Sequence, residues 1–132
     1  MFLNRLSEEE KKGFLELAHH IARVDNDFND KEQIMISKYC MEMQMDDIEY
    51  DESSFDLNKS LSVVKEESNQ KIVLLEIMAL VYSDDILRPA EDKVLKHVVD
   101  FYDLNPNLVI VYKEWAKTIL SLFVQGEALI HI

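Results

Sequence analysis

Asp25-Asn26-Asp27-Phe28-Asn29-Asp30-Lys31-Glu32 is an acidic segment whose pattern returns later in the chain, as Asp84-Asp85-Ile86-Leu87-Arg88-Pro89-Ala90-Glu91. Both copies contain an Asp, an apolar residue three positions later and a Glu seven positions after the Asp. Asp25 and Asp84 are 59 positions apart, and so are Glu32 and Glu91. A pattern repeated at a fixed spacing is typical of an internal duplication, so the sequence predicts two related halves.

Apolar residues flank each acidic segment at helical spacing. Before the first copy, a capping box of Ser7 and Glu10 opens a helix, whose apolar positions are Phe14, Leu17, Ala18, Ile21 and Val24. After it, Asn29 and Glu32 form a second capping box. The second copy lies between a predicted helix over about 70–83 and another that starts with Pro89. The sequence therefore predicts two helix–acidic turn–helix units, over about 8–45 and 69–104.

The remaining segments complete an all-α prediction. Residues 42–56 contain seven acids and no base, which is typical of a solvated connection, and Asp56 caps a short helix. A last helix is predicted over about 106–125, ended by Gly126 and followed by an apolar tail over 128–132. Because it is apolar most of the way round, it is expected to be central, or else to offer one face to a partner. The fold class is thus a single all-α domain over 1–132, with six or seven helices and two halves around a buried C-terminal helix.

Composition narrows the class of protein. The chain has 132 residues, 48% of them hydrophobic, and only two Gly and two Pro, which favours a packed helical domain. A formal charge of −12 repels phosphate backbones and anionic lipid surfaces, so we expect no nucleic acid and no membrane insertion. Cys40 is the only cysteine, which excludes an intrachain disulfide and a cysteine-rich zinc site. The N-terminal sequence lacks a signal-peptide pattern, and a cytoplasmic location is expected.

The doubled motif resembles the tellurite-resistance TerB-like family. The residues that carry the resemblance are 18–28 with Glu32, and 80–87 with Glu91. It extends over roughly residues 8–125. It implies two related helical halves, a role in stress response or tellurite resistance, and divalent-cation binding through the acidic turns. The residue after the motif Asp is commonly Gly in that family, whereas this chain has Asn26 and Asp85, which both tolerate positive φ.

A divalent-cation site is the first functional hypothesis. Its ligands would be Asp25, Glu32, Asp84 and Glu91, with Asp27 and Asp85 secondary. All are oxygen donors, which favours Ca²⁺, Mg²⁺ or Mn²⁺ over softer metals. The first segment is not an EF-hand loop, because Asp30 and Ile36 stand where that loop needs Gly and a bidentate Glu. A site would therefore combine both halves.

The alternative is an acidic protein-interaction module without a metal site. Glu32 and Glu91 then serve as helix caps, and the Asp residues accept backbone N–H groups in their turns. Its partners would be basic surfaces or other stress-response proteins, and the C-terminal helix or tail would suit a homo-oligomer. No phosphate-binding loop, nucleophile elbow or HExxH motif is present, so we expect no enzymatic activity.

Overall fold

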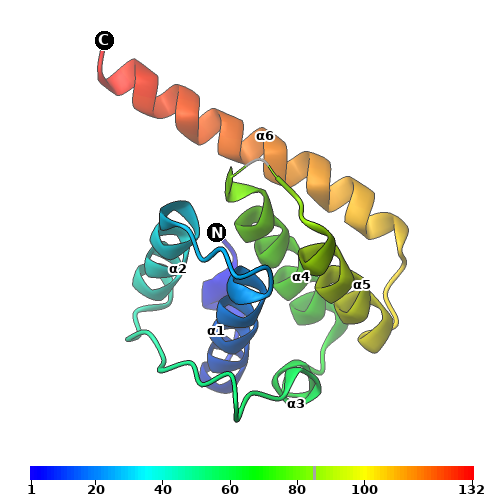
Figure 1. Cartoon of the computed structure of the whole chain (residues 1–132). Coiled ribbons are helices and arrows are strands. Elements are labelled where there is room, and N and C mark those ends of the chain that lie inside the picture. Colours follow the sequence, from blue (N-terminus) through cyan, green and yellow to red (C-terminus); the bar gives the residue numbers. More distant parts are fainter. Residues whose placement is uncertain (85) are drawn as a thin grey trace.

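The computed structural model describes residues 1–84 and 86–132, which form six α-helices and two short 3-10 helices (Figure 1). The elements are η1 (Leu3–Arg5), α1 (Glu8–Arg23), α2 (Asp30–Met43), α3 (Leu57–Ser62), α4 (Glu67–Val81), η2 (Tyr82–Asp84), α5 (Pro89–Phe101) and α6 (Asn107–Ile130). No strand occurs in these residues. The all-α class and the predicted number of helices are therefore confirmed.

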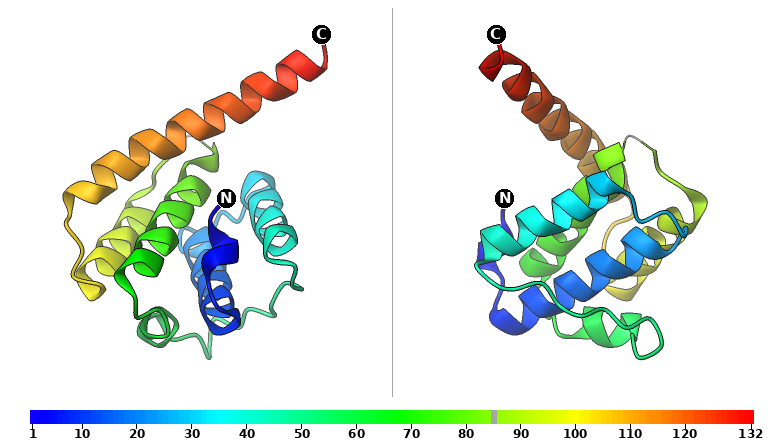
Figure 2. Two further views of the ribbon diagram at one scale, coloured as in Figure 1. Left: turned by 180° about the vertical axis from the view of Figure 1, so that it is seen from behind. Right: turned by 60° about the vertical axis from the view of Figure 1, so that its left-hand side comes forward.

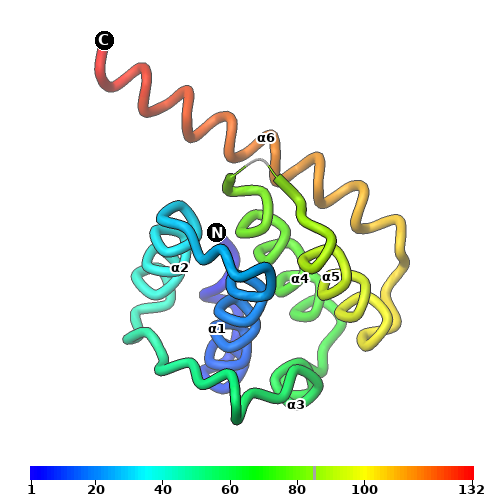
Figure 3. The backbone as a smooth tube through the Cα atoms, viewed as in Figure 1, coloured from blue at the N-terminus to red at the C-terminus, as the bar shows by residue number. Residues whose placement is uncertain are grey.

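The helix boundaries repeat at the spacing of the acidic motif. Shifting α1 and α2 by 59 residues gives 67–82 and 89–102, and the observed α4 and α5 span Glu67–Val81 and Pro89–Phe101. Figure 3 shows the two helix–turn–helix pairs, α1 with α2 and α4 with α5. Helix α4 starts three residues before the predicted position, because its N-cap Glu66 makes no capping hydrogen bond and leaves no cap signal in the sequence.

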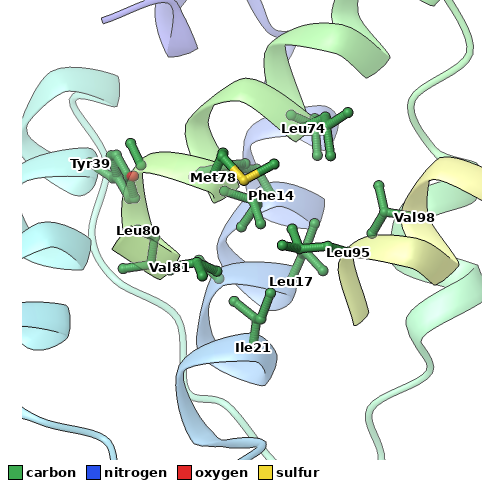
Figure 4. Packing of buried hydrophobic residues seen from close by; sticks show 14 of the residues in the cluster. Phe14, Leu17, Ile21, Tyr39, Leu74, Met78, Leu80, Val81, Leu95 and Val98 are labelled. Atoms are coloured by element: carbon green, nitrogen blue, oxygen red, sulfur yellow. The ribbon is translucent and has the colours of Figure 1, made fainter. Parts of the chain in front are cut away.

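The hydrophobic core lies between the two pairs. Figure 4 shows α1, α2, α4 and α5 contributing to it, with the labelled side chains Phe14, Leu17, Ile21, Tyr39, Leu74, Met78, Leu80, Val81, Leu95 and Val98. All ten are buried, and each contributes about 1.5–3 kcal/mol when fully removed from water. The polar tip of Tyr39 is satisfied, because its hydroxyl donates to the carbonyl of Glu76 at 2.7 Å. The core thus fixes where the turn of each pair lies.

Helices α1 and α3 approach closely at Gly13. A Cβ at this position would lie 2.9 Å from the carbonyl oxygen of Ser60 and 2.9 Å from Cγ2 of Val63. The first of these atoms is backbone, so α3 would have to move. We expect Gly13→Ala to lower the free energy of unfolding by about 1–3 kcal/mol despite the better helix propensity of Ala, measured by urea denaturation. An unchanged midpoint would mean that α3 is not held against α1.

The predicted burial of the C-terminal helix is wrong. Helix α6 packs across α4 and η2 on the outside of the domain, and Ala116 is its one buried residue. Its second half extends away from the other helices in both views of Figure 2. The predicted end near residue 125 is also wrong, since Gly126 lies inside the helix and most of the expected tail is helical. Apolar periodicity does not distinguish a helix buried by its own chain from one left exposed, and one glycine weakens a helix by only about 1 kcal/mol.

Candidate functional site between the acidic turns

The two acidic turns share one side-chain hydrogen bond. Asn26 has a left-handed φ of 62°, as its residue type allows. In the first turn the Oδ1 atom of Asp25 accepts the backbone N–H of Asp27 at 3.0 Å. In the second, Oδ1 of Asp84 accepts the N–H of Ile86 at 3.1 Å. Each Asp therefore uses one oxygen to close its own turn, and the other oxygen is available for a contact between the halves.

Arg88 joins the two turns. Its Nη1 atom lies 3.1 Å from Oδ2 of Asp25 and 3.1 Å from Oδ2 of Asp84, and its Nη2 atom lies 3.0 Å from Oδ2 of Asp27. Asn29 adds a fourth contact by donating from Nδ2 to Oδ2 of Asp84 at 3.1 Å. Asp25 and Asp84 are largely buried, with side chains 7% and 13% exposed, whereas that of Asp27 is 54% exposed. The predicted meeting of the halves occurs, with a guanidinium between the carboxylates.

Glu32 and Glu91 cap the helices that follow the turns. Oε1 of Glu32 accepts the backbone N–H of Asn29 at 3.3 Å, and Oε1 of Glu91 accepts that of Arg88 at 3.1 Å. Asn29 completes the first capping box, because its Oδ1 accepts the N–H of Glu32 at 3.0 Å. Both Glu residues are only 1% exposed. The capping role in the sequence-based alternative is thus present for both.

The surroundings of Glu32 and Glu91 disfavour the ionised form of their carboxyl groups. Burial, helped by the nearby charges of Glu91, Asp25 and Asp84, raises the pKa of Glu32 to about 7, although the hydrogen bond from the backbone N–H of Asn29 opposes this rise. Burial likewise raises the pKa of Glu91 to about 7, with Asp25 and Asp84 adding to the effect. The four carboxyl groups therefore interact as one cluster, and at neutral pH Glu32 and Glu91 retain protons that isolated carboxyls would release.

Arg88 is the functional residue that motif analysis missed. It occupies the position equivalent to Asn29 in the second copy, 59 residues later, and both residues contact Asp84. A signal for it was present in the sequence. The N-cap position favours Ser, Thr, Asn or Asp, and Arg there has no capping advantage. An Arg at this position among repeated acids indicates a role for its charge.

The remaining predicted residues are placed as follows. Asp27 lies at the exposed edge of the cluster, and the predicted secondary ligand Asp85 falls outside the described residues. Among the described residues, no group of three or more His, Cys, Asp or Glu side chains is arranged to hold a metal ion. The second oxygens of Asp25 and Asp84 are turned onto Arg88 instead. The guanidinium of Arg88 thus lies between two carboxylates that the sequence predicts as metal ligands.

Comparison with known protein families, with curated proteins and with solved structures finds no significant match to this chain. None of the helices in the described ranges is both long enough and apolar enough to cross a membrane. The assignment of a function therefore depends on the geometry and charge of the site itself.

Two adjacent histidines, His19 and His20, and the single cysteine, Cys40, lie outside this cluster. His19 is buried, with Nε2 2.7 Å from Oδ1 of Asp47 and Nδ1 2.6 Å from Nη1 of Arg23. His20 stacks on Phe55 at 4.6 Å between ring centroids. Cys40 is buried on α2, and burial raises its thiol pKa to about 11, so the thiolate is scarce at neutral pH.

Proposed function

We propose that this chain is a non-enzymatic, TerB-like domain that binds a divalent cation between its paired acidic turns, in exchange for Arg88. Oxygen atoms of Asp25, Asp84, Glu32 and Glu91 would be the donors, with Asp27 at the exposed edge. An all-oxygen set of this kind favours Ca²⁺, Mg²⁺ or Mn²⁺. A role in stress response, as the family resemblance implies, belongs to the same proposal, and so does a cytoplasmic location.

One observation carries the proposal, namely the shortage of positive charge at the cluster. The guanidinium of Arg88 contacts three carboxylates, and two further buried carboxyls, Glu32 and Glu91, have a pKa raised to about 7. A single positive charge does not balance five acids. A divalent cation at the same place would supply a second charge and would favour the ionised form of both Glu side chains.

Arg88 also sets the expected strength of binding. A cation has to separate the guanidinium from Asp25 and Asp84 before their Oδ2 atoms become ligands. The guanidinium side chain is 28% exposed, so it has a route into solvent. Binding is therefore expected to be weak and coupled to movement of Arg88, and a site of this kind would respond to cation concentration rather than hold a permanent ion.

Thermal melting tests the proposal. The protein is freed of metal and titrated with Ca²⁺, Mg²⁺ or Mn²⁺ at constant ionic strength, beside Asp25→Asn/Asp84→Asn. We expect a saturable rise of the melting temperature for at least one ion. At a free ion concentration of a hundred times the dissociation constant, the gain in the free energy of unfolding should be about 2.7 kcal/mol. The rise should be absent in the double variant. Equal rises in both proteins would show general screening of the −12 charge and would refute the site.

The second candidate is an acidic interaction module with no metal site. It is favoured by the fact that the four main predicted ligands already have partners. Asp25 and Asp84 accept hydrogen bonds in their turns and contact Arg88, and both Glu side chains cap helices. It predicts binding to a basic probe such as oligolysine that weakens with salt and is unchanged by chelators. If a chelator abolished this binding, the result would instead show that the partner binds only when the cation is bound.

A further inference from the structure

The second half of α6 is an apolar helix without a partner in the described structure. It runs beyond α2 and α4 into solvent (Figures 1 and 2). Leu122 is 53% exposed, Phe123 59%, Leu129 69% and Ile130 76%. Monomeric soluble proteins rarely expose large contiguous apolar surfaces, and where they do the surface commonly marks an interaction site. The surface involves none of the acidic-turn residues.

These side chains form one stripe along the helix. We define the distal seam as Ile119, Leu122, Phe123, Gly126, Leu129 and Ile130. Successive residues of an α-helix are rotated by about 100°, so spacings of three and four place all six within one arc. The same stripe continues from Tyr112, Trp115 and Ala116, through which the first half of α6 packs on the domain. The distal seam therefore continues the face by which α6 packs on the domain, but it extends beyond the hydrophobic core and has no partner helix there in the described structure.

Gly126 lies in the middle of the distal seam. A Cβ at Gly126 would meet no atom within 4 Å, so no contact inside the chain requires a glycine. A glycine within a helix weakens it by about 1 kcal/mol relative to Ala. Its local advantage is that the backbone of another helix can approach closely at this point, between the larger residues of the distal seam.

The charge distribution indicates which partner fits. Residues 107–132 contain Lys113 and Lys117 against Glu114 and Glu127, so they are neutral, and the whole charge of −12 lies on residues 1–106. A basic partner gains nothing from a neutral helix. A second copy of α6 meets no repulsion there, and an antiparallel arrangement keeps the two acidic bodies at opposite ends.

We propose that the distal seam pairs with the distal seam of a second copy of this chain, antiparallel and crossing at Gly126. This register is self-complementary, as a twofold interface requires. Phe123 of one copy lies opposite Leu129 of the other, and Leu122 lies opposite Ile130. The pairing buries the apolar surface that the fold leaves exposed and gives Gly126 its function.

Sedimentation equilibrium of the full chain tests the proposal. We expect a concentration-dependent species of twice the monomer mass, lost in Leu122→Glu and in Leu129→Glu. The matched control is Val124→Glu, because Val124 is 71% exposed in the same half of α6 but lies on the opposite face. Circular dichroism confirms that each variant is folded. A wild-type monomer at every concentration, or a dimer that survives both seam variants, would overturn the proposal.

Cysteine cross-linking then tests the register in a Cys40→Ala background. A mixture of Phe123→Cys and Leu129→Cys chains should form the mixed disulfide in preference to either like pair. Preference for like pairs would indicate parallel helices and contradict the arrangement. Co-sedimentation of a monomeric wild-type chain with phosphatidylcholine vesicles would assign the distal seam to a lipid surface, and would also overturn the proposal.

Discussion

Arg88→Ala is expected to lower the melting temperature of the cation-free protein by roughly 5–10 °C, because it leaves buried carboxylates without their counter-charge. Asp25 and Asp84 each lose a contact of 3.1 Å, and their side chains are only 7% and 13% exposed. Differential scanning calorimetry in chelator-treated buffer measures the change.

Lys96→Ala is the matched control for this variant. It removes one positive charge from α5, the helix that Arg88 precedes, where Lys96 pairs with Asp92 at 2.8 Å and is 73% exposed. Exposed pairs of this kind contribute little, so the melting temperature should change by no more than about 2 °C. An equal loss in both variants would show that net charge, rather than the bridge between the turns, determines stability.

The same Arg88→Ala protein should be more sensitive to divalent cations than the wild type. Without the guanidinium, a cation no longer displaces an ion pair, so it should stabilise the variant at a lower concentration. Matched additions of NaCl separate this effect from screening. If Ca²⁺, Mg²⁺ and Mn²⁺ restore the variant no better than NaCl of equal ionic strength, Arg88 is a structural bridge and does not compete with a metal.

Glu32→Gln/Glu91→Gln is expected to stabilise the cation-free protein at pH 8 by a few kcal/mol, since each unit of pKa shift is worth about 1.4 kcal/mol. Both carboxyls have a folded-state pKa of about 7, above the ordinary value of 4.5. Between these values the folded state binds more protons than the unfolded chain. The contribution of Glu32 and Glu91 to the free energy of unfolding is therefore fully present below about pH 4.5, and it is lost as the pH rises through 7.

The measurement is urea denaturation of wild type and double variant between pH 5 and 8. The wild type should lose stability relative to the variant as the pH rises, and the two should converge near pH 5. Gln retains the capping hydrogen bond, so the helices remain capped. His20, whose pKa is lowered by burial, has the opposite slope and cancels in the difference. Glu10→Gln, in the capping box of α1 and away from the acidic turns, controls for the amide itself.

A saturating divalent cation should change how the stability of the wild type depends on pH. When a cation lies beside Glu32 and Glu91, it favours their ionised form, and the wild type should no longer weaken between pH 5 and 8. The double variant, which lacks two proposed ligands, should show no such gain. A pH dependence that persists unchanged with every ion tested would argue against binding at the cluster.

Much of the local structure followed from sequence. The capping boxes at Ser7 and Asn29, the left-handed Asn26 and the first-turn Pro89 all occur as predicted, because each depends on residues within one turn of the chain. The fixed spacing of the motif also predicted the two helix pairs, since the same local rules act twice.

Features that depend on distant contacts were not predictable in the same way. The guanidinium of Arg88 reaches Asp25 across 63 positions of sequence, and only the packed fold brings the turns close enough. The sequence predicts a buried α6 because the composition of this helix resembles that of a core helix. Its exposure depends on the other helices having closed the core without it.

The most direct test of the central claim is an NMR titration that follows the Arg88 side chain. With uniformly ¹⁵N-labelled protein at constant ionic strength, the Arg88 Nε–H signal and the backbone signals of the two acidic turns are recorded as a divalent cation is added. Exchange of Arg88 for the cation predicts saturable shifts confined to the turns and the guanidinium, with one shared midpoint. Small shifts spread over the acidic surface, with Arg88 unmoved, would contradict it.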